Sequence, residues 1–238
     1  MKKYNKILIV GGTGFIGFHL AKFFLKKKWK VVSISRKKPT KIRFLKKVHY
    51  INFDISKKNF FSKKLNTIKN VKYVINASGE VDHKNKKKVY LSHFIGVKNL
   101  ANFFIGKNLK KFIQFGSSLE YGKKKSPHYE NFKIKPVSNY AKAKSSATNY
   151  LLNLNLIKNF PTVIVRPYQV YGPHQDTNRF IPIVINNCLK NNKFPCSDGF
   201  QKRDFLFIDD FIKAIYALIK KNKTSGEVIN IGSGKALR

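Results

Sequence analysis

Residues 7 to 17 read Ile-Leu-Ile-Val-Gly-Gly-Thr-Gly-Phe-Ile-Gly, and this stretch decides the fold. Four apolar residues in a row are typical of a strand buried in a parallel sheet. Gly11, Gly14 and Gly17 then form a tight turn into a helix that continues through Leu20. Side chains at the glycines would block the approach of a pyrophosphate, and the N–H groups at a helix start attract this anion. The stretch therefore predicts a dinucleotide-binding site.

Length and composition set the outer limits. With 238 residues, of which 42% are hydrophobic, the chain is large enough for one core and a small additional lobe. Its apolar runs fall short of the roughly 20 residues of a membrane-spanning helix, so we expect no membrane span. Cys188 and Cys196 are too few for a disulfide framework, which favours a reducing cytoplasm. We therefore expect a cytoplasmic enzyme, and we assign no metal ligands.

The net charge is unusual, because 49 Lys and Arg residues stand against 11 Asp and Glu residues and give +38. Such a field attracts polyanions, including RNA, DNA and anionic membranes. The basic residues, however, are scattered in short runs such as 26–28, 86–88 and 123–125, without an aromatic-rich nucleic-acid module. We expect most of this charge on solvated faces and nucleic acid not to be a dedicated partner, with an RNA- or membrane-associated protein as an alternative.

Strand-like and helix-like segments alternate along the first two thirds of the chain. The segments that predict strands are 6–10, 31–35, 48–53, 73–76, 112–116 and 162–165. Those that predict helices are 15–27, 89–105 and 141–158. This alternation predicts an α/β fold with a doubly wound, parallel sheet of the Rossmann type.

The pattern changes after Pro167, where a loop punctuated by Pro and Gly begins. Further along, the chain predicts helices over 181–190 and 209–221, with a short strand over 204–207 between them. We therefore predict a dinucleotide-binding domain over residues 1–166 and a small, partial substrate-binding lobe over residues 167–238. A late strand, 227–231, is expected to return to the main fold.

The end of the second predicted strand bears on the choice of cofactor. A site for NAD is expected to place an acid about 20 residues beyond the glycines, where it holds the ribose hydroxyls. Ser35 stands in that place and is followed by Arg36, which can stack on adenine and pair with a 2′-phosphate. This favours NADP over NAD, with a solvated basic turn as the alternative. Asp54, which follows the third strand beside Ile55, is a candidate partner for the adenine amino group.

Tyr140 and Lys144 are four residues apart and so share one face of a predicted helix. Tyrosine is a poor base at its ordinary pKa of about 10, but a neighbouring ammonium and an oxidised nicotinamide stabilise the phenolate. The spacing alone is close to chance in this composition; its weight comes from its place after Ser117-Ser118, whose hydroxyls can bind a substrate oxygen. A polar turn that caps a helix is the alternative for these serines.

Several motifs occur in one order along almost the whole chain. They are Gly11-Gly-Thr-Gly-Phe-Ile-Gly17, Asn76-Ala-Ser-Gly79, Gly116-Ser-Ser-Leu-Glu-Tyr-Gly122, Tyr140-x-x-x-Lys144, Arg166-Pro-Tyr-Gln-Val-Tyr-Gly-Pro173, Arg203-Asp-Phe205, Asp209-Asp210 and Asn230-Ile-Gly232. In this order the chain resembles the extended short-chain dehydrogenases/reductases, in the NAD-dependent epimerase/dehydratase group that acts on nucleotide sugars. The resemblance runs from residue 7 to residue 232 and implies a Rossmann fold and a nucleotide-sugar substrate.

The resemblance implies roles for the matching residues. Tyr140 would exchange a proton with the sugar oxygen while hydride moves between C4 and nicotinamide; Lys144 would bind the nicotinamide ribose and lower the Tyr140 pKa. Ser117 matches the catalytic serine or threonine. The residues expected to bind the cofactor, besides Tyr140 and Lys144, are Gly11, Thr13, Gly14, Phe15, Ile16, Gly17, Ser35, Arg36, Asp54, Ile55, Ala77, Ser78 and Gly79. Those expected to bind the substrate are Ser118, Gln169, His174 and, through the diphosphate, Arg203.

Departures from the family pattern discriminate among reactions. The dehydratases of this group place an acid two residues after the catalytic serine or threonine, often with another acid beside it. Here these positions hold Leu119 and Ser118. A leucine cannot deliver a proton to a leaving hydroxyl, so the sequence disfavours dehydration.

Other departures concern the substrate. Gln169 replaces an asparagine that usually positions it, and His174 stands where a resemblance to GDP-fucose synthases would place a proton donor. The cysteine that those enzymes use with it matches Leu119 and is absent, so we expect His174 to contact substrate or solvent. His93 and Val97 replace a frequent Asn and Thr, which indicates a divergent subgroup.

The leading hypothesis is an NAD(P)-dependent nucleotide-sugar oxidoreductase, either a 4-ketoreductase or a 4-epimerase. Arg36 favours the first, since epimerases tend to keep tightly bound NAD and the acid that recognises it. The family normally continues beyond the Asn-Ile-Gly strand, whereas this sequence stops at Arg238, so we expect either a shortened substrate lobe or one that a partner completes. The alternative is thus a catalytically weak, cofactor-binding protein with a regulatory or scaffold role. The expected partners are a nucleotide sugar and a second copy of the chain, in a homodimer.

Overall fold

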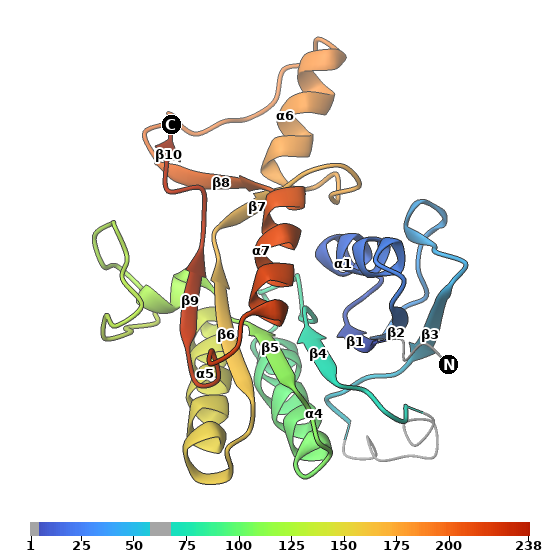
Figure 1. The fold of residues 1–238 in the computed structure, drawn as a ribbon. Coiled ribbons are helices and arrows are strands. Elements are labelled where there is room, and N and C mark those ends of the chain that lie inside the picture. The colour runs from blue at the N-terminus through green and yellow to red at the C-terminus, as the bar shows by residue number, and fades with distance from the viewer. Residues whose placement is uncertain (1–4, 58–67) are drawn as a thin grey trace.

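The main sheet of the protein contains seven parallel strands. The computed structural model describes residues 5–57 and 68–238, and its strand order is β3-β2-β1-β4-β5-β6-β9. The strands are β1 (Lys6–Val10), β2 (Lys30–Ser35), β3 (Val48–Asn52), β4 (Tyr73–Asn76), β5 (Lys111–Phe115), β6 (Thr162–Pro167) and β9 (Val228–Ile231). Every pair in this sheet is parallel, and the order reverses between β1 and β4 (Figure 1). A ligand crevice is expected at such a reversal, beyond the carboxyl ends of the strands.

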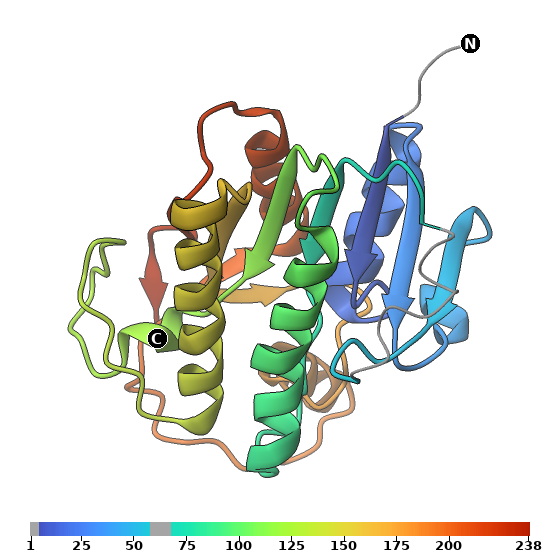
Figure 2. The same cartoon turned by 90° about the horizontal axis from the view of Figure 1, so that it is seen from below.

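Helices cover both faces of the main sheet. One face carries α1 (Phe15–Lys26) and α7 (Ile208–Lys220), and the other carries α3 (Lys86–Tyr90), α4 (Gly96–Phe104) and α5 (Asn139–Lys158). Seen from below, α4 and α5 run side by side along their face (Figure 2). This arrangement confirms the doubly wound α/β fold.

Alternating side chains of each strand feed two separate cores, because successive residues of a strand point to opposite faces. Leu8 and Val74 pack in the cluster beneath α4 and α5, whereas Ile9 and Ile75 pack in the cluster beneath α1 and α7. All four are completely buried. The unbroken apolar run at residues 7–10 is therefore explained by a strand that is covered on both faces.

Most predicted segments agree with the structure to within a residue or two. The predicted helix 89–105 is wrong at its start, because α3 already begins at Lys86, where the Asn85 side chain accepts a hydrogen bond from the Lys88 N–H (2.9 Å). A π-helical turn, Leu91–Ile95, then joins α3 to α4. The two short strands described next were not predicted, because three and two residues are too few to show a period.

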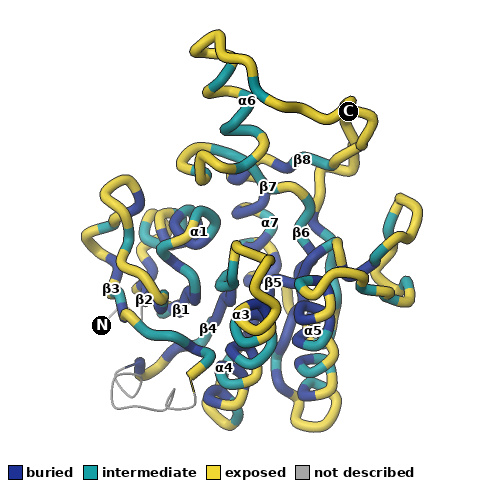
Figure 3. The backbone as a smooth tube through the Cα atoms, turned by 180° about the vertical axis from the view of Figure 1, so that it is seen from behind, coloured by how far each residue is buried: buried dark blue, intermediate teal, exposed yellow. Residues whose placement is uncertain are grey.

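A small second sheet stands beyond the carboxyl ends of the main strands. It consists of β7 (Gln169–Tyr171), β8 (Arg203–Phe207) and β10 (Ala236–Leu237), and β6 leads into it through Tyr168 (Figure 1). The helix α6 (Phe180–Leu189) projects from the same side, and none of its residues is buried (Figure 3). Since β9 lies in the main sheet, the residues after 166 contribute to both parts; the domain boundary itself stays a prediction.

Among residues 5–57 and 68–238, no helix combines the length and the apolar character that crossing a membrane requires.

Candidate active site

The glycine turn between β1 and α1 is shaped by close backbone contacts. Gly11 has a φ of +85°, and a side chain there would lie 2.8 Å from the Ser78 nitrogen. A side chain at Gly17 would collide with the carbonyl oxygen of Gly11. The turn is also tied to β2, because the Thr13 N–H donates to Ser35 Oγ (3.3 Å). Both glycines therefore allow helix α1 to start directly against the sheet.

The start of α1 fits a pyrophosphate. Gly14 caps this 12-residue helix without a side-chain hydrogen bond, and its first turn carries no acid. The free N–H groups and the helix dipole therefore present a positive end to the crevice beyond β1. Phe15, Ile16 and Gly17 form the first turn, as the expected cofactor site requires.

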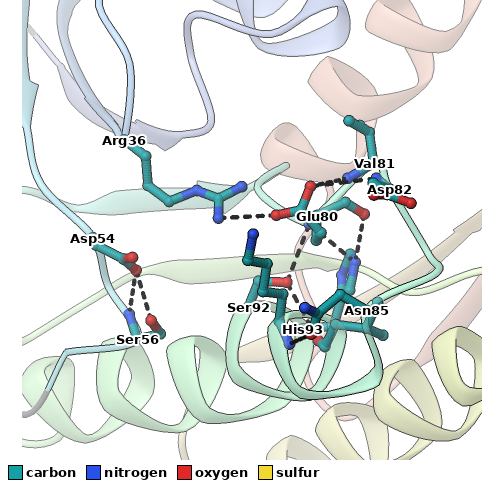
Figure 4. A network of polar contacts seen from close by, with 11 residues as sticks. Arg36, Asp54, Ser56, Glu80, Val81, Asp82, Asn85, Ser92 and His93 are labelled. Atoms are coloured by element: carbon teal, nitrogen blue, oxygen red, sulfur yellow. Dashed lines mark hydrogen bonds and ion pairs between the residues drawn. The ribbon is translucent and has the colours of Figure 1, made fainter.

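The adenosine end of the expected site lies beyond β2 and β3. Arg36 follows β2 and forms an ion pair with Glu80 (3.1 Å) (Figure 4). Asp54 follows β3, and its carboxylate accepts hydrogen bonds from the N–H and hydroxyl of Ser56 (2.9 and 2.7 Å). The Ile55 side chain is buried against Gly96, so it supports this loop from the core.

The loop after β4 borders the expected cofactor site on its other side. The Ala77 N–H continues the sheet by donating to the Val10 carbonyl (2.9 Å), and the Ser78 hydroxyl donates to Asn76 Oδ1 (2.6 Å). Gly79 comes next, and a side chain there would collide with the His93 ring. The backbone of 77–79 therefore lies close over the carboxyl end of β4.

Ser117 is held by a reciprocal helix cap at the end of β5. Its hydroxyl accepts a hydrogen bond from the Leu119 N–H (3.2 Å), and its own N–H donates to Glu120 Oε1 (2.8 Å). This capping box fixes the backbone of residue 117 at the start of a 3₁₀ turn, Ser118–Tyr121. The Ser117 side chain also forms a hydrogen bond with Tyr140.

Tyr140 and Lys144 lie in the first turns of α5, where Ser138 caps the helix through the Ala141 N–H (3.1 Å). The Lys144 ammonium donates to the Phe115 carbonyl at the end of β5 (2.6 Å) and lies 5.8 Å from the centre of the Tyr140 ring. Strand β5 and helix α5 therefore bring together Ser117, Tyr140 and Lys144, the three residues that the sequence assigned to catalysis.

Burial governs the protonation of this cluster. It raises the pKa of Tyr140, while the hydrogen bond with Ser117 and the charge of Arg179 act in the opposite direction without overcoming it. It also lowers the pKa of Lys144 to about 8, against the opposing charge of Glu120. Without a bound cofactor, Tyr140 is thus protonated at neutral pH and can donate a proton. The lowered tyrosine pKa that we expected from the sequence would need a further positive charge, such as that of an oxidised nicotinamide.

The Lys144 shift predicts a pH dependence of stability. Because its pKa falls from 10.5 in the unfolded chain to about 8 in the folded one, the unfolded chain holds more protons between these values. The unfolding free energy contributed by Lys144 therefore rises with pH in this window. We expect the difference between wild type and Lys144→Met, measured by urea unfolding, to rise by on the order of 1 kcal/mol per pH unit. A difference that stays constant would contradict the burial of a charged ammonium.

Glu120 links the cluster to the core through buried polar contacts. Its carboxylate Oε2 accepts hydrogen bonds from Arg166 and from the Thr148 hydroxyl, both at 3.0 Å. The Glu120 side chain is 0% exposed and that of Arg166 is 3% exposed. The Arg166 guanidinium also lies 4.6 Å from the centre of the Tyr121 ring. The backbone of Ser117 therefore rests on a buried ion pair.

Two histidines flank Tyr140, and neither was assigned a role from the sequence. His83 stacks on the tyrosine ring at 4.2 Å, and His93 meets it edge-on at 4.9 Å. Burial lowers the pKa of His93 to about 3, so this ring is neutral. His83 lies in the loop between β4 and α3, which has no regular periodicity. His93 was noted solely as a departure from the family pattern. Local sequence patterns therefore could not predict that both rings contact Tyr140.

Arg179, which caps α6, was also missed. Its charge acts on both His83 and Tyr140: the His83 pKa is lowered, mainly by burial and then by Arg179, and Arg179 opposes the rise at Tyr140. The charge of Arg179, at the start of α6, therefore acts on both rings. A helix start without a serine, threonine or aspartate cap gave no signal in the sequence.

The residues expected to bind substrate lie on a 3₁₀ turn, on the small sheet and in the loop after β7. Ser118 lies on the 3₁₀ turn beside Ser117, whereas Gln169 and Arg203 lie exposed on β7 and β8. His174 packs instead against α1, 5.3 Å from the Phe18 ring, with its carbonyl oxygen bound by the buried Arg43. Ser118 directly follows Ser117 of the cluster with Tyr140 and Lys144, while His174 lies against α1, which follows the glycine turn.

Comparisons with known proteins point to one family. The family model described as "NAD dependent epimerase/dehydratase family" matches residues 7–232. A putative UDP-glucose 4-epimerase of Methanocaldococcus jannaschii is 31% identical, in an alignment that covers 96% of this chain and 77% of the relative. A dTDP-D-glucose 4,6-dehydratase of Dictyostelium discoideum is 29% identical, in an alignment that covers 96% of this chain and 58% of the relative.

Solved structures show the same fold. The UDP-glucuronic acid 4-epimerase of Bacillus cereus, crystallised with NAD, superimposes with a TM-score of 0.86 at 27% sequence identity. The superposition covers 97% of this chain and 78% of that one. Epimerases and dehydratases both occur among the similar proteins, so the overall likeness leaves the choice between these reactions to the residues of the site.

Proposed function

Because the chain belongs to the NAD-dependent epimerase/dehydratase family, whose members bind NAD and modify nucleotide sugars, we propose that it is a nucleotide-sugar oxidoreductase acting at the sugar C4. The reaction is a 4-keto reduction or a 4-epimerisation. The observation that supports it is the cluster of Ser117, Tyr140 and Lys144 at the junction of β5 and α5.

Each side chain of the cluster has a part that its contacts suit. Tyr140, protonated and hydrogen-bonded to Ser117, holds the proton that passes to or from the sugar oxygen. Ser117 would hold the same oxygen, and the hydrogen bond from its N–H to Glu120 supports this role by fixing its backbone. Lys144 is anchored by the Phe115 carbonyl beside the tyrosine ring and supplies positive charge for a phenolate. The nicotinamide, when bound, supplies or accepts the hydride.

The proposal disfavours 4,6-dehydration, although dehydratases are among the relatives. Leu119 is 54% exposed and has no proton to give, and Ser118 is not acidic at neutral pH. Glu120, the nearest acid in the sequence, is fully buried and is occupied by Arg166, Thr148 and the backbone of Ser117. These contacts leave the loop without an acid that can reach a substrate hydroxyl.

A substrate with a diphosphate fits the charge of the chain. The net charge of +38 favours anions in general, and the arginines Arg179 and Arg203 lie on the small lobe. Guanidinium groups bind phosphate oxygens in a bidentate manner. A nucleotide sugar would thus extend from Tyr140 into the small lobe, with its diphosphate near these arginines.

The test is a titration of the purified chain with NADPH and NADH, followed by a panel of nucleotide sugars and their 4-keto forms. Cofactor oxidation triggered by one keto sugar supports a reductase and identifies its substrate. Interconversion of two C4 epimers without net oxidation supports an epimerase. Cofactor binding without turnover on the panel contradicts the proposal and favours the catalytically weak alternative, and release of a 4-keto-6-deoxy product would show a dehydratase.

Cofactor choice is tested at Arg36, which we propose to pair with a 2′-phosphate. A charged hydrogen bond of this kind contributes about 1.5–3 kcal/mol, so Arg36→Ala should weaken NADPH binding by about tenfold to a hundredfold. NADH binding should change by less than about threefold, since NADH carries no 2′-phosphate. Fluorescence titration of both nucleotides measures the ratio. Lys38→Ala, which removes the same charge from an exposed neighbour, is the control, and equal losses for both nucleotides at Arg36 would refute the assignment.

A further inference from the structure

One ion pair joins the two segments between which the cofactor is proposed to lie. Arg36 directly follows β2 and Glu80 lies four residues after β4, yet their side chains meet at 3.1 Å (Figure 4). Strand β1 lies between β2 and β4, and its carboxyl end leads into the glycine turn. Two strand spacings separate β2 from β4, about 10 Å. The pair therefore passes over the end of β1, beside the start of α1.

Glu80 is the fixed partner of this pair. Its carboxylate Oε1 accepts hydrogen bonds from the Val81 and Asp82 N–H groups (3.0 and 3.3 Å). Its own N–H donates to Ser92 Oγ and lies against His93 Nε2, both at 3.1 Å. The Glu80 side chain is 14% exposed, against 44% for Arg36. Two backbone N–H groups therefore hold one oxygen of the carboxylate, and Ser92 and His93 hold the Glu80 backbone, so a change of partner is expected to come from the more exposed Arg36.

Glu80 is ionised in this setting. Burial by itself raises its pKa, but the hydrogen bonds from Asp82 and Arg36 outweigh burial, and the pKa lies below its ordinary value. The positive charge of Arg36 is thus already balanced by a neighbouring negative charge. A phosphate that approaches Arg36 meets this carboxylate as well, and the two anions repel each other across the guanidinium.

We propose that Glu80 is a specificity-determining residue of the cofactor site, which competes with the 2′-phosphate of NADP for Arg36 and so shifts the preference toward NAD. The inference rests on the proposed function, in that it needs a dinucleotide in this crevice. Sequence reasoning places the determinant of this choice on β2 alone, where Ser35 has replaced an acid. The structure adds an acid from the loop after β4, which is 44 residues away from Arg36 in the sequence.

The experiment separates the adenosine end from the catalytic cluster. Wild type, Glu80→Gln, Arg36→Gln and the double variant are titrated by calorimetry with adenosine 2′,5′-bisphosphate and with ADP, at one salt concentration. The amide of glutamine keeps an acceptor for the Val81 and Asp82 N–H groups but removes the charge. We expect Glu80→Gln to tighten the bisphosphate about fivefold, in line with a partly exposed ion pair, and ADP by less than twofold.

The double variant decides whether Arg36 mediates the effect. In the Arg36→Gln background, Glu80→Gln should leave the ratio of the two affinities unchanged. Asp210→Asn is the matched control, because it removes one negative charge from an exposed pair with Lys213 on α7 and should change neither affinity. Circular dichroism of each variant verifies that the fold is retained.

The results distinguish two kinds of failure. If wild type binds ADP but Glu80→Gln tightens both ligands equally, or tightens the bisphosphate also without Arg36, the competition is refuted and the proposed function stands. If wild type binds neither these ligands nor NAD, the cofactor site itself is refuted, and the proposal falls with it.

Discussion

Tyr140→Phe should lower kcat by about a thousandfold, because general acid–base catalysis by one positioned side chain contributes roughly 10²–10⁴. The substitution removes the hydroxyl that Ser117 binds and keeps the ring, against which His83 and His93 pack. Cofactor affinity should therefore stay within about twofold of wild type. Turnover of the substrate found in the panel, together with fluorescence titration of the cofactor, measures both quantities on one preparation.

Tyr150→Phe is the matched control for this prediction. Tyr150 lies on the same helix α5, but its hydroxyl donates to Asn102 at the outer face (2.6 Å), away from the cluster. We expect its kcat to equal that of wild type. A Tyr140→Phe variant with normal turnover would remove Tyr140 from the reaction and with it the proposed chemistry. Loss of both turnover and cofactor binding would show that the hydroxyl serves binding instead.

The largest expected loss of stability follows from Glu120→Gln. Removing one partner of a buried ion pair leaves an uncompensated charge and costs about 3–5 kcal/mol. Here Arg166 would lose the carboxylate that it meets at 3.0 Å in a site where both side chains are almost fully buried. The glutamine NH2 group would also face donors, either the Ser117 N–H at one oxygen position or both Arg166 and the Thr148 hydroxyl at the other. For a chain of this size, the melting temperature should fall by roughly 10 °C.

Asp210→Asn again provides the comparison, because its pair with Lys213 has the same length of 3.0 Å but is 61% and 71% exposed. Exposed pairs contribute little to stability because water and salt screen their charges, so this variant should melt within about 2 °C of wild type. Scanning calorimetry of the three proteins at one pH measures the shifts. Equal melting temperatures for Glu120→Gln and wild type would show that Arg166 finds another partner, and the buried pair would then not support Ser117.

The strands, the glycine turn and the alternating order of elements could be predicted from the sequence, because each depends on neighbours within a few residues. The run 7–10 has no polar side chain, which requires cover on both faces of a strand. Gly11 lies before the helix and Gly17 lies in its first turn, at the spacing that is typical of a dinucleotide-binding turn. The four-residue separation of Tyr140 and Lys144 likewise follows from helical geometry alone.

The contacts around the candidate site could not be predicted from neighbouring residues in the sequence. Arg36 meets Glu80 across 44 residues, and Arg166 meets Glu120 across 46 residues. Both pairs form because parallel strands bring their carboxyl ends to one edge of the sheet, whatever their distance in the chain. The stacking of His83 on Tyr140 arises in the same way, between the loop after β4 and the start of α5.

The sequence by itself therefore determined the α/β fold, the place of the glycine turn and the residue types available for chemistry. Periodicity and backbone sterics act locally and leave their record in consecutive residues. The tertiary structure alone decided which charges are neutralised and which protons are held, since pKa values and ion pairs depend on burial and on distances between segments remote in the chain. Glu80 illustrates this: an unremarked acid in the sequence, it becomes a partner of Arg36 where β2 and β4 end at the same edge.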